Sequence, residues 1–126
     1  MRVGLIVDSA CDLPYEFSRK HDLFVLPVTA VIDGQTYIDK HDLVRTQEFY
    51  QSGLLQKGHQ AETRAFTAEQ IHDLFMEKIV TQFDIAICET VTKSRSLIFQ
   101  NATEAMNSVL ANYEGAREAA GRDGRF

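Results

Sequence analysis

Three short apolar runs constrain the fold of this chain more than any other feature of its sequence. They lie at residues 3–7, 24–26 and 84–88, and the last of them begins with Asp84. Apolar and polar side chains do not alternate along these runs. Runs of this kind are typical of strands covered on both faces, as in a parallel sheet. Helical patterns lie between them, so the sequence predicts an α/β layer structure.

The first half of the chain carries a helix pattern and a hairpin pattern. A helix is expected from about Leu13 to Lys20, with Asp12 as its N-cap. Two strand patterns, at 28–32 and 35–38, flank the pair Asp33-Gly34. Because Asp-Gly supplies the positive φ angles of a type I′ turn, we expect a small antiparallel hairpin beside the parallel sheet.

The middle of the chain contains two helix starts separated by a segment without periodicity. Thr46 is expected to cap one helix, and residues 53–65, with two glycines, are expected to form a loop. Thr67 and Gln70 then form a capping box, in which each side chain bonds the other residue's backbone. This pattern predicts a helix that starts directly after Thr67.

A long helix is expected to start near Ser94 or Ser96. Its apolar stripe consists of Leu97, Ile98, Ala102, Ala105, Met106, Val109, Leu110 and Tyr113. Past Gly115 the sequence is charged and rich in glycine. We therefore expect one domain at 1–115 and a flexible C-terminal tail at 116–126.

Composition excludes several classes of protein. Of the 126 residues, 44% are hydrophobic and 25% charged, a balance typical of soluble globular domains. The net charge is -5 and the basic residues are scattered, which argues against nucleic acid as a partner. No apolar run approaches the roughly 18 residues of a membrane span, so we expect a cytoplasmic protein without membrane insertion. Cys11 and Cys88 are expected to be free thiols, and no metal or cofactor site is predicted.

Ligands of open α/β sheets collect at the carboxyl ends of the strands. Three segments are expected there, at residues 8–12, 62–67 and 90–96. The last two combine hydroxyl groups with helix starts, which favours an anion such as a carboxylate or phosphate. Arg64 and Lys93 can add charge-assisted hydrogen bonds to such a ligand.

The same residues also have purely structural explanations. Ser94 and Ser96 are explained equally well as helix caps, Asp8 as a tie for its own loop, and Arg64 and Lys93 as solvated charges. No phosphate-binding loop or nucleophile elbow is present, so no catalytic residue is assigned. An enzyme acting on an anionic small molecule, and a protein-interaction module, both stay open as alternatives to a ligand carrier.

Several motifs nevertheless resemble one family. Residues 6–14 resemble the opening DS-x-x-DLP signature of the DegV family of fatty-acid-binding proteins. Residues 25–28 and 32–39 resemble the family's second strand and hairpin, and residues 42–50 its following helix. The resemblance covers nearly the whole chain and identifies it as an N-terminal lobe of that family.

The resemblance implies a lipid carrier rather than an enzyme. Family members have two lobes and bind one long-chain fatty acid, with the carboxylate at the strand ends and the acyl chain in an apolar tunnel. Some of them present the carboxylate to a separate fatty-acid kinase, and no cofactor is required. The second lobe would follow Phe126. The face exposed without it would favour a homodimer.

Two family motifs hold the ligand head group, and this chain diverges in both. The Thr-Ser motif reads Thr63-Arg64 here, and the Ser-Ser-x-x-Ser-Gly-Thr motif reads as residues 92–98, in which Leu97-Ile98 replace Gly-Thr. The changes suit a more anionic or bulkier head group. The resemblance implies ligand contacts from Thr63, Arg64, Thr92, Ser94 and Ser96, supported by Asp8, Ser9 and Lys93.

Overall fold

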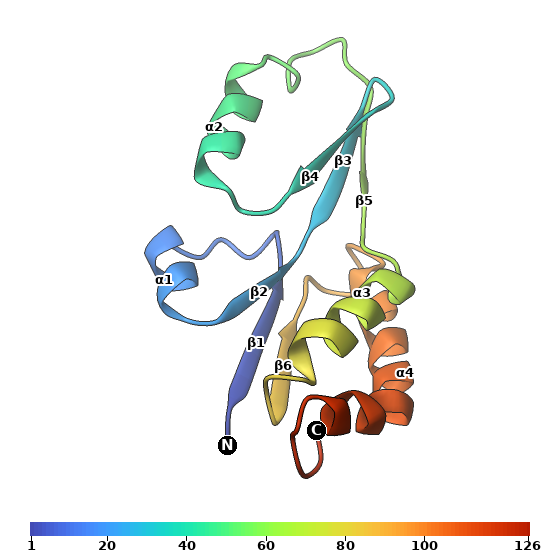
Figure 1. Ribbon diagram of the computed structural model, residues 1–126. Helices are drawn as coiled ribbons and strands as arrows, with labels where there is room; N and C mark the ends of the chain where they lie inside the picture. Colours follow the sequence, from blue (N-terminus) through green and yellow to red (C-terminus); the bar gives the residue numbers. More distant parts are fainter.

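The three apolar runs form a parallel sheet. The computed structural model describes residues 1–126 and contains two three-stranded sheets, joined where the chain passes from one to the other (Figure 1). In the first sheet, β1 (Val3–Asp8) lies between β2 (Leu23–Leu26) and β6 (Ile85–Glu89), and both pairings are parallel. The predicted parallel sheet is therefore confirmed.

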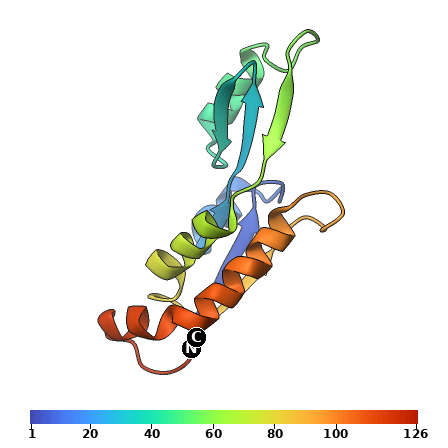
Figure 2. The ribbon, with the colours of Figure 1, turned by 90° about the vertical axis from the view of Figure 1, so that its right-hand side faces the viewer.

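The second sheet is antiparallel and contains the predicted hairpin. Strand β3 (Val28–Ile32) lies between β4 (Gln35–Asp39) and β5 (Ala61–Arg64). Asp33 and Gly34 join β3 to β4 with φ angles of 49° and 82°, as the Asp-Gly turn predicts. Figure 2 shows this sheet above the parallel sheet, with the helices α3 and α4 beside the lower one.

Strand β5 corrects the prediction that residues 53–65 form a loop throughout. All four residues of β5 are exposed, so the strand carries no buried apolar side chains that would mark it in the sequence. It is held instead by backbone pairing with β3, in a register that places Thr63 opposite Ala30. An exposed edge strand leaves no hydrophobic alternation for sequence analysis to detect.

The helices lie close to the predicted segments. Their bounds are α1 (Tyr15–Lys20), α2 (Leu43–Gln51), α3 (Ala68–Leu74), the π-helix η1 (Phe75–Ile79) and α4 (Ile98–Ala119). Helix α3 runs directly into η1, so the single predicted helix after the capping box contains one wider turn. None of these helices has the length and apolar character needed to cross a bilayer.

Two predicted N-caps are wrong. Pro14, not Asp12, occupies the N-cap position of α1, and no side chain caps that helix. The residue before a proline avoids the helical region, so the helix starts only after Pro14. In α2 the cap is Asp42 rather than Thr46, because the Asp42 carboxylate accepts a hydrogen bond from the Arg45 backbone N–H at 2.9 Å.

The other helix starts follow the sequence signals more closely. The capping box before α3 is confirmed, since Thr67 Oγ1 accepts from Gln70 N at 3.2 Å and Gln70 Oε1 accepts from Thr67 N at 3.0 Å. Helix α4 begins at Ile98, slightly later than predicted. Ser96 Oγ accepts from the Ile98 N–H at 3.2 Å and so supports the first turn of α4.

The hydrophobic core lies between the parallel sheet and the helices α3, η1 and α4. Its buried residues are Ile6, Leu26, Ile71, Phe75, Ile79, Val80, Phe83, Ile98, Ala102, Ala105 and Val109. Leu97 and Leu110 were expected in the α4 stripe but are exposed. Leu97 precedes the first turn, and Leu110 lies one residue beyond the buried Val109, which rotates it by about 100° around the helix.

The C-terminal residues differ from the expected tail. Helix α4 continues through Gly115 and ends at Ala119, and the Arg117 side chain is buried. The Arg117 guanidinium donates to the carbonyl oxygens of Val80 and Phe83 at 3.0 and 2.6 Å. A charged, glycine-rich sequence is therefore ordered here by buried hydrogen bonds, which composition does not indicate.

The opposite face of the parallel sheet is open at β6. The side chains of Ile85 and Ile87 point to this face and are 43% and 54% exposed. Strand β6 also pairs only with β1. Helices therefore cover the β6 end of this sheet on one side only.

Candidate functional site

Asp8 ties two loops together at the carboxyl edge of the parallel sheet. Asp8 is the last residue of β1, and it is only 2% exposed. One carboxylate oxygen accepts from the Ala10 N–H at 2.9 Å, and the other accepts from the Val91 N–H at 2.6 Å. Through Val91, Asp8 fixes the β6–α4 loop against the loop after β1.

Ser9 connects the two sheets. Its hydroxyl oxygen accepts from the Val28 N–H at 2.9 Å, where β3 begins, and its own N–H donates to Leu26 O at 3.0 Å. The Ser9 carbonyl accepts a 2.6 Å hydrogen bond from Nε2 of His41, which has a positive φ of 57°. Ser9 is buried, so it supports the site rather than facing a ligand.

The β6–α4 loop presents hydroxyl groups to solvent. The hydroxyls of Thr92 and Ser94 are 2.8 Å apart, and the Ser94 N–H donates to Thr92 Oγ1 at 3.2 Å. Lys93 lies between them, and all three residues are exposed. Ser96 is half-buried, and its hydroxyl oxygen already accepts a bond from the start of α4. Thr92 and Ser94 are therefore the hydroxyls in this loop best placed to donate to an anion.

Thr63 and Arg64 are the last two residues of β5. The Thr63 side chain is exposed and makes no hydrogen bond within the chain. The Arg64 guanidinium is paired with the Glu62 carboxylate of the same strand, with Nε at 2.9 Å from Oε1. Thr63 is therefore free to contact a ligand, whereas Arg64 would first have to leave Glu62.

Asn101 links these two segments. Its side-chain N–H donates to the Phe66 carbonyl oxygen at 2.7 Å and so joins the first turn of α4 to the linker that follows Thr63. Figure 1 shows the β6–α4 loop and the start of α3 at the same end of the parallel sheet. The sequence prediction did not include Asn101, because a single polar residue in an amphipathic helix gives no signal of a tertiary contact.

The space behind this rim is occupied by the protein's own side chains. Ile6, Leu26, Ile71, Phe75 and Ile98 are all 0% exposed and belong to one packed cluster. Protein interiors of this kind leave few voids larger than a water molecule. An acyl chain bound at the rim would therefore have to lie on a surface of this chain, not inside its core.

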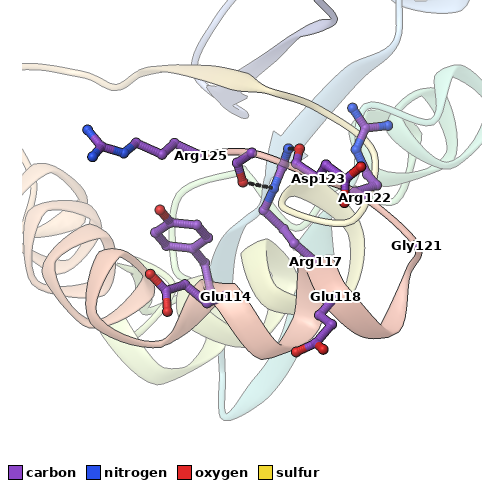
Figure 3. Close-up of a pocket in the computed structure, with 9 residues that line it drawn as sticks. Glu114, Arg117, Glu118, Gly121, Arg122, Asp123 and Arg125 are labelled. Carbon is purple, nitrogen blue, oxygen red and sulfur yellow. Dashed lines mark hydrogen bonds between the residues drawn. The ribbon is translucent and has the colours of Figure 1, made fainter.

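A second polar cluster lies at the amino ends of β1 and β6, beside the C-terminal turn. Figure 3 shows Arg117 reaching from α4 toward this turn, where its guanidinium donates to the carbonyl oxygens of Asp123 and Gly124. Asp84 accepts from Arg117 at 3.1 Å and from Arg122 at 2.6 Å. Because Arg117 and Arg122 both bond Asp84, with only Arg122 Nε left without a partner, the pocket beside them is a structural feature and not our candidate site.

Neither of the two thiols near the rim is an activated nucleophile. Burial, with a smaller effect from the Asp8 carboxylate, raises the pKa of Cys88 to about 11. Desolvation raises the pKa of Cys11, and the nearby carboxylates of Glu89, Asp8 and Asp12 raise it further. Both thiols are free, as predicted, and both favour the protonated form. The chemistry available at the rim is hydrogen bonding to an anion.

Comparison with known proteins gives one consistent family. The family model described as "Uncharacterised protein, DegV family" matches residues 2–117. A DegV domain-containing protein of Xanthomonas axonopodis pv. citri is 41% identical over 126 residues, and one of Xanthomonas campestris pv. campestris is 40% identical over 126 residues. The matches cover 100% of this chain and 40% of each relative. The chain therefore spans less than half the length of these relatives.

Solved structures agree with the fold. A DegV lipid-binding protein from Thermotoga maritima matches with a TM-score of 0.78 at 22% identity, over 86% of this chain and 39% of that one. A stearic-acid-binding protein from Eubacterium ventriosum matches with a TM-score of 0.72 at 31% identity, over 86% of this chain and 37% of that one. These matches confirm the predicted α/β fold with its hairpin extension.

Proposed function

The chain belongs to the DegV family, and on this basis we propose that it forms the head-group-binding part of a protein that holds a long-chain fatty acid. One observation carries the proposal: 86% of the chain aligns with a stearic-acid-binding protein at 31% identity. The exposed hydroxyls at the carboxyl edge of the sheet suit the carboxylate of such a ligand. The chain spans 40% of its curated relatives, so the proposed ligand contacts are those that these 126 residues can supply.

The proposed head-group contacts come from two segments. Thr63 on one side, and Thr92 and Ser94 on the other, donate hydroxyl hydrogen bonds to the carboxylate. Lys93 adds a positive charge beside them, and Asp8 holds the second segment in place through Val91. Hydrogen bonds to a charged group contribute about 1.5–3 kcal/mol each, enough to fix the orientation of the head group.

The acyl chain supplies most of the binding free energy in this proposal. Each methylene group removed from water contributes about 0.8 kcal/mol, so a long tail outweighs a few polar contacts. The core of this chain is filled, so we place the tail against apolar surface outside it, completed by the rest of the longer protein. The open β6 face with Ile85 and Ile87 is one such surface. We propose that a second copy of the chain covers the open β6 face in a homodimer of the 126-residue chain.

We assign binding rather than catalysis to this site. Both thiols near the strand ends have raised pKa values. The hydroxyls of Thr92 and Ser94 contact each other and not a general base. A carboxylate held at an exposed rim stays accessible to a second protein, so the proposed partner is a fatty-acid kinase that acts on the bound ligand. The proposed location is the cytoplasm, where such a kinase would meet it.

The test is binding of a fluorescent palmitate analogue to the chain and to its variants. We expect the double variant Thr92→Val with Ser94→Ala to weaken binding about tenfold or more, because the hydroxyl that donates to the carboxylate and the hydroxyl that orients it are both lost. The control is Thr81→Val, which removes a hydroxyl that bonds Glu77 O on the surface after η1. Equal affinity of the double variant and the control would contradict the proposed head-group site.

A further inference from the structure

A groove separate from the hydroxyl rim runs along β2. Its volume is about 390 Å³, within the range of ligand-binding sites in proteins. Leu23, Phe24 and Val25 of β2 line one side, and Leu74 of α3 and Lys78 of η1 line the other. Side chains alternate between the two faces of a strand, so three consecutive lining residues mean that the groove follows the strand's edge.

The edge of β2 in this groove is unpaired. Strand β2 pairs with β1 and with no other strand. The Leu26 carbonyl accepts from Ser9 N, on the β1 side. Backbone groups alternate in direction along a strand, so those of Val25 point to the free edge. The groove thus combines an apolar wall with a backbone donor and acceptor able to pair with another strand.

Two lysines give the groove its charge. Lys40 and Lys78 are the charged residues of its lining, and neither has a carboxylate within ion-pair distance. The carboxylates beside Lys40 in sequence are engaged elsewhere, since Asp39 accepts from His41 N and Asp42 from Arg45 N. In a chain of net charge -5, an apolar groove with two unpaired cations favours an anionic partner.

We infer that this groove binds an extended acidic peptide, which adds to the free edge of β2 as a fourth strand. Its backbone pairs with Val25, its apolar side chains contact Phe24 and Leu74, and its carboxylates lie beside Lys40 and Lys78. Strand addition of this kind draws affinity from main-chain hydrogen bonds. A fatty acid fits the groove less well, because its tail would cover the backbone groups of Val25 without bonding them. The inference does not depend on the proposed function.

The test uses a fluorescein-labelled seven-residue peptide of alternating valine and glutamate, with binding to the 126-residue chain measured by anisotropy at low salt. We expect Lys78→Glu to weaken binding at least fivefold. The matched control Lys57→Glu, which makes the same charge change on an exposed loop outside the groove, should stay within twofold of the unmodified chain. A peptide with N-methylated backbone at alternate residues should lose at least tenfold in affinity, because it cannot pair with β2.

Three results would overturn the inference. The first is equal binding by Lys78→Glu and Lys57→Glu, which would leave only a general charge effect. The second is unchanged affinity of the N-methylated peptide, which would exclude strand pairing. The third is complete displacement of the peptide by sodium laurate, which would assign the groove to an acyl chain. The head-group variant Thr92→Val with Ser94→Ala should bind the peptide normally, so the two sites are tested separately.

Discussion

The Asp84 carboxylate holds the two ends of the chain together. It accepts a 2.7 Å hydrogen bond from the Arg2 backbone N–H, and it also binds Arg122 and Arg117. The Arg2 N–H lowers the pKa of Asp84 most, followed by Arg122 and then Arg117, so the folded value lies well below the ordinary range of a carboxyl group. A group of this kind links the stability of the fold to pH.

This link predicts a loss of stability in acid. Because the folded pKa of Asp84 is lowered, its contribution is fully present above the unfolded value of about 3.9 and is lost as the pH falls toward the folded value. Between pH 6 and pH 3, the free energy of unfolding should therefore fall more steeply for the unmodified chain than for Asp84→Asn. Urea denaturation at several pH values measures the free energy of unfolding of the two proteins. Parallel pH curves for the two proteins would contradict this role of Asp84.

Single residues also show which part of the candidate site the sequence could predict. The hydroxyls of Thr92 and Ser94 were expected from the loop motif, and the structure places them in contact. Arg64 was expected as a ligand contact, but its charge is paired with Glu62, a neighbour two positions away that spacing does not identify as its partner. Asn101 and His41 were missed because their roles are tertiary contacts to backbone carbonyls, which leave no local pattern.

At the scale of elements, burial decides what the sequence could predict. The strands β1, β2 and β6 were predicted from their apolar runs, although only one face of β6 is covered, since Ile85 and Ile87 are exposed. Strand β5 was missed because it is exposed along its whole length and depends on pairing with β3. The start of α1 was misplaced because the restriction that a proline imposes on its preceding residue outweighed a good capping residue.

Close packing between β1 and the turn before β6 gives a second prediction. A Cβ at Gly4 would lie 2.9 Å from ring atoms of Phe83, which is itself buried. Gly4→Ala should therefore cost about 1–3 kcal/mol, because the ring has no space into which to move. The matched change Gly115→Ala, in α4 with open space around it, should instead stabilise the fold by about 0.5–1 kcal/mol. Urea denaturation of both variants measures the difference, and similar effects in both would contradict the packing argument.

At the scale of the whole molecule, the chain has the DegV fold over residues 2–117 and spans 40% of its curated relatives. Its fold aligns with the solved structures from Thermotoga maritima and Eubacterium ventriosum over 86% of its residues, but it spans only 37–39% of those chains. The sequence predicted the α/β class and the family because both depend on motifs within these residues. The apolar tunnel that the family resemblance implies is not visible in these residues, whose core is filled by their own side chains.

A crystal structure of the chain bound to palmitate tests the central claim most directly. We predict that the carboxylate lies at the carboxyl edge of the parallel sheet, with an oxygen at about 2.5–3.0 Å from the hydroxyl of Thr92 or Ser94. The Thr63 hydroxyl should face the same head group, and the tail should cross apolar surface outside the core. A carboxylate found elsewhere, for example between Lys40 and Lys78, would contradict the account.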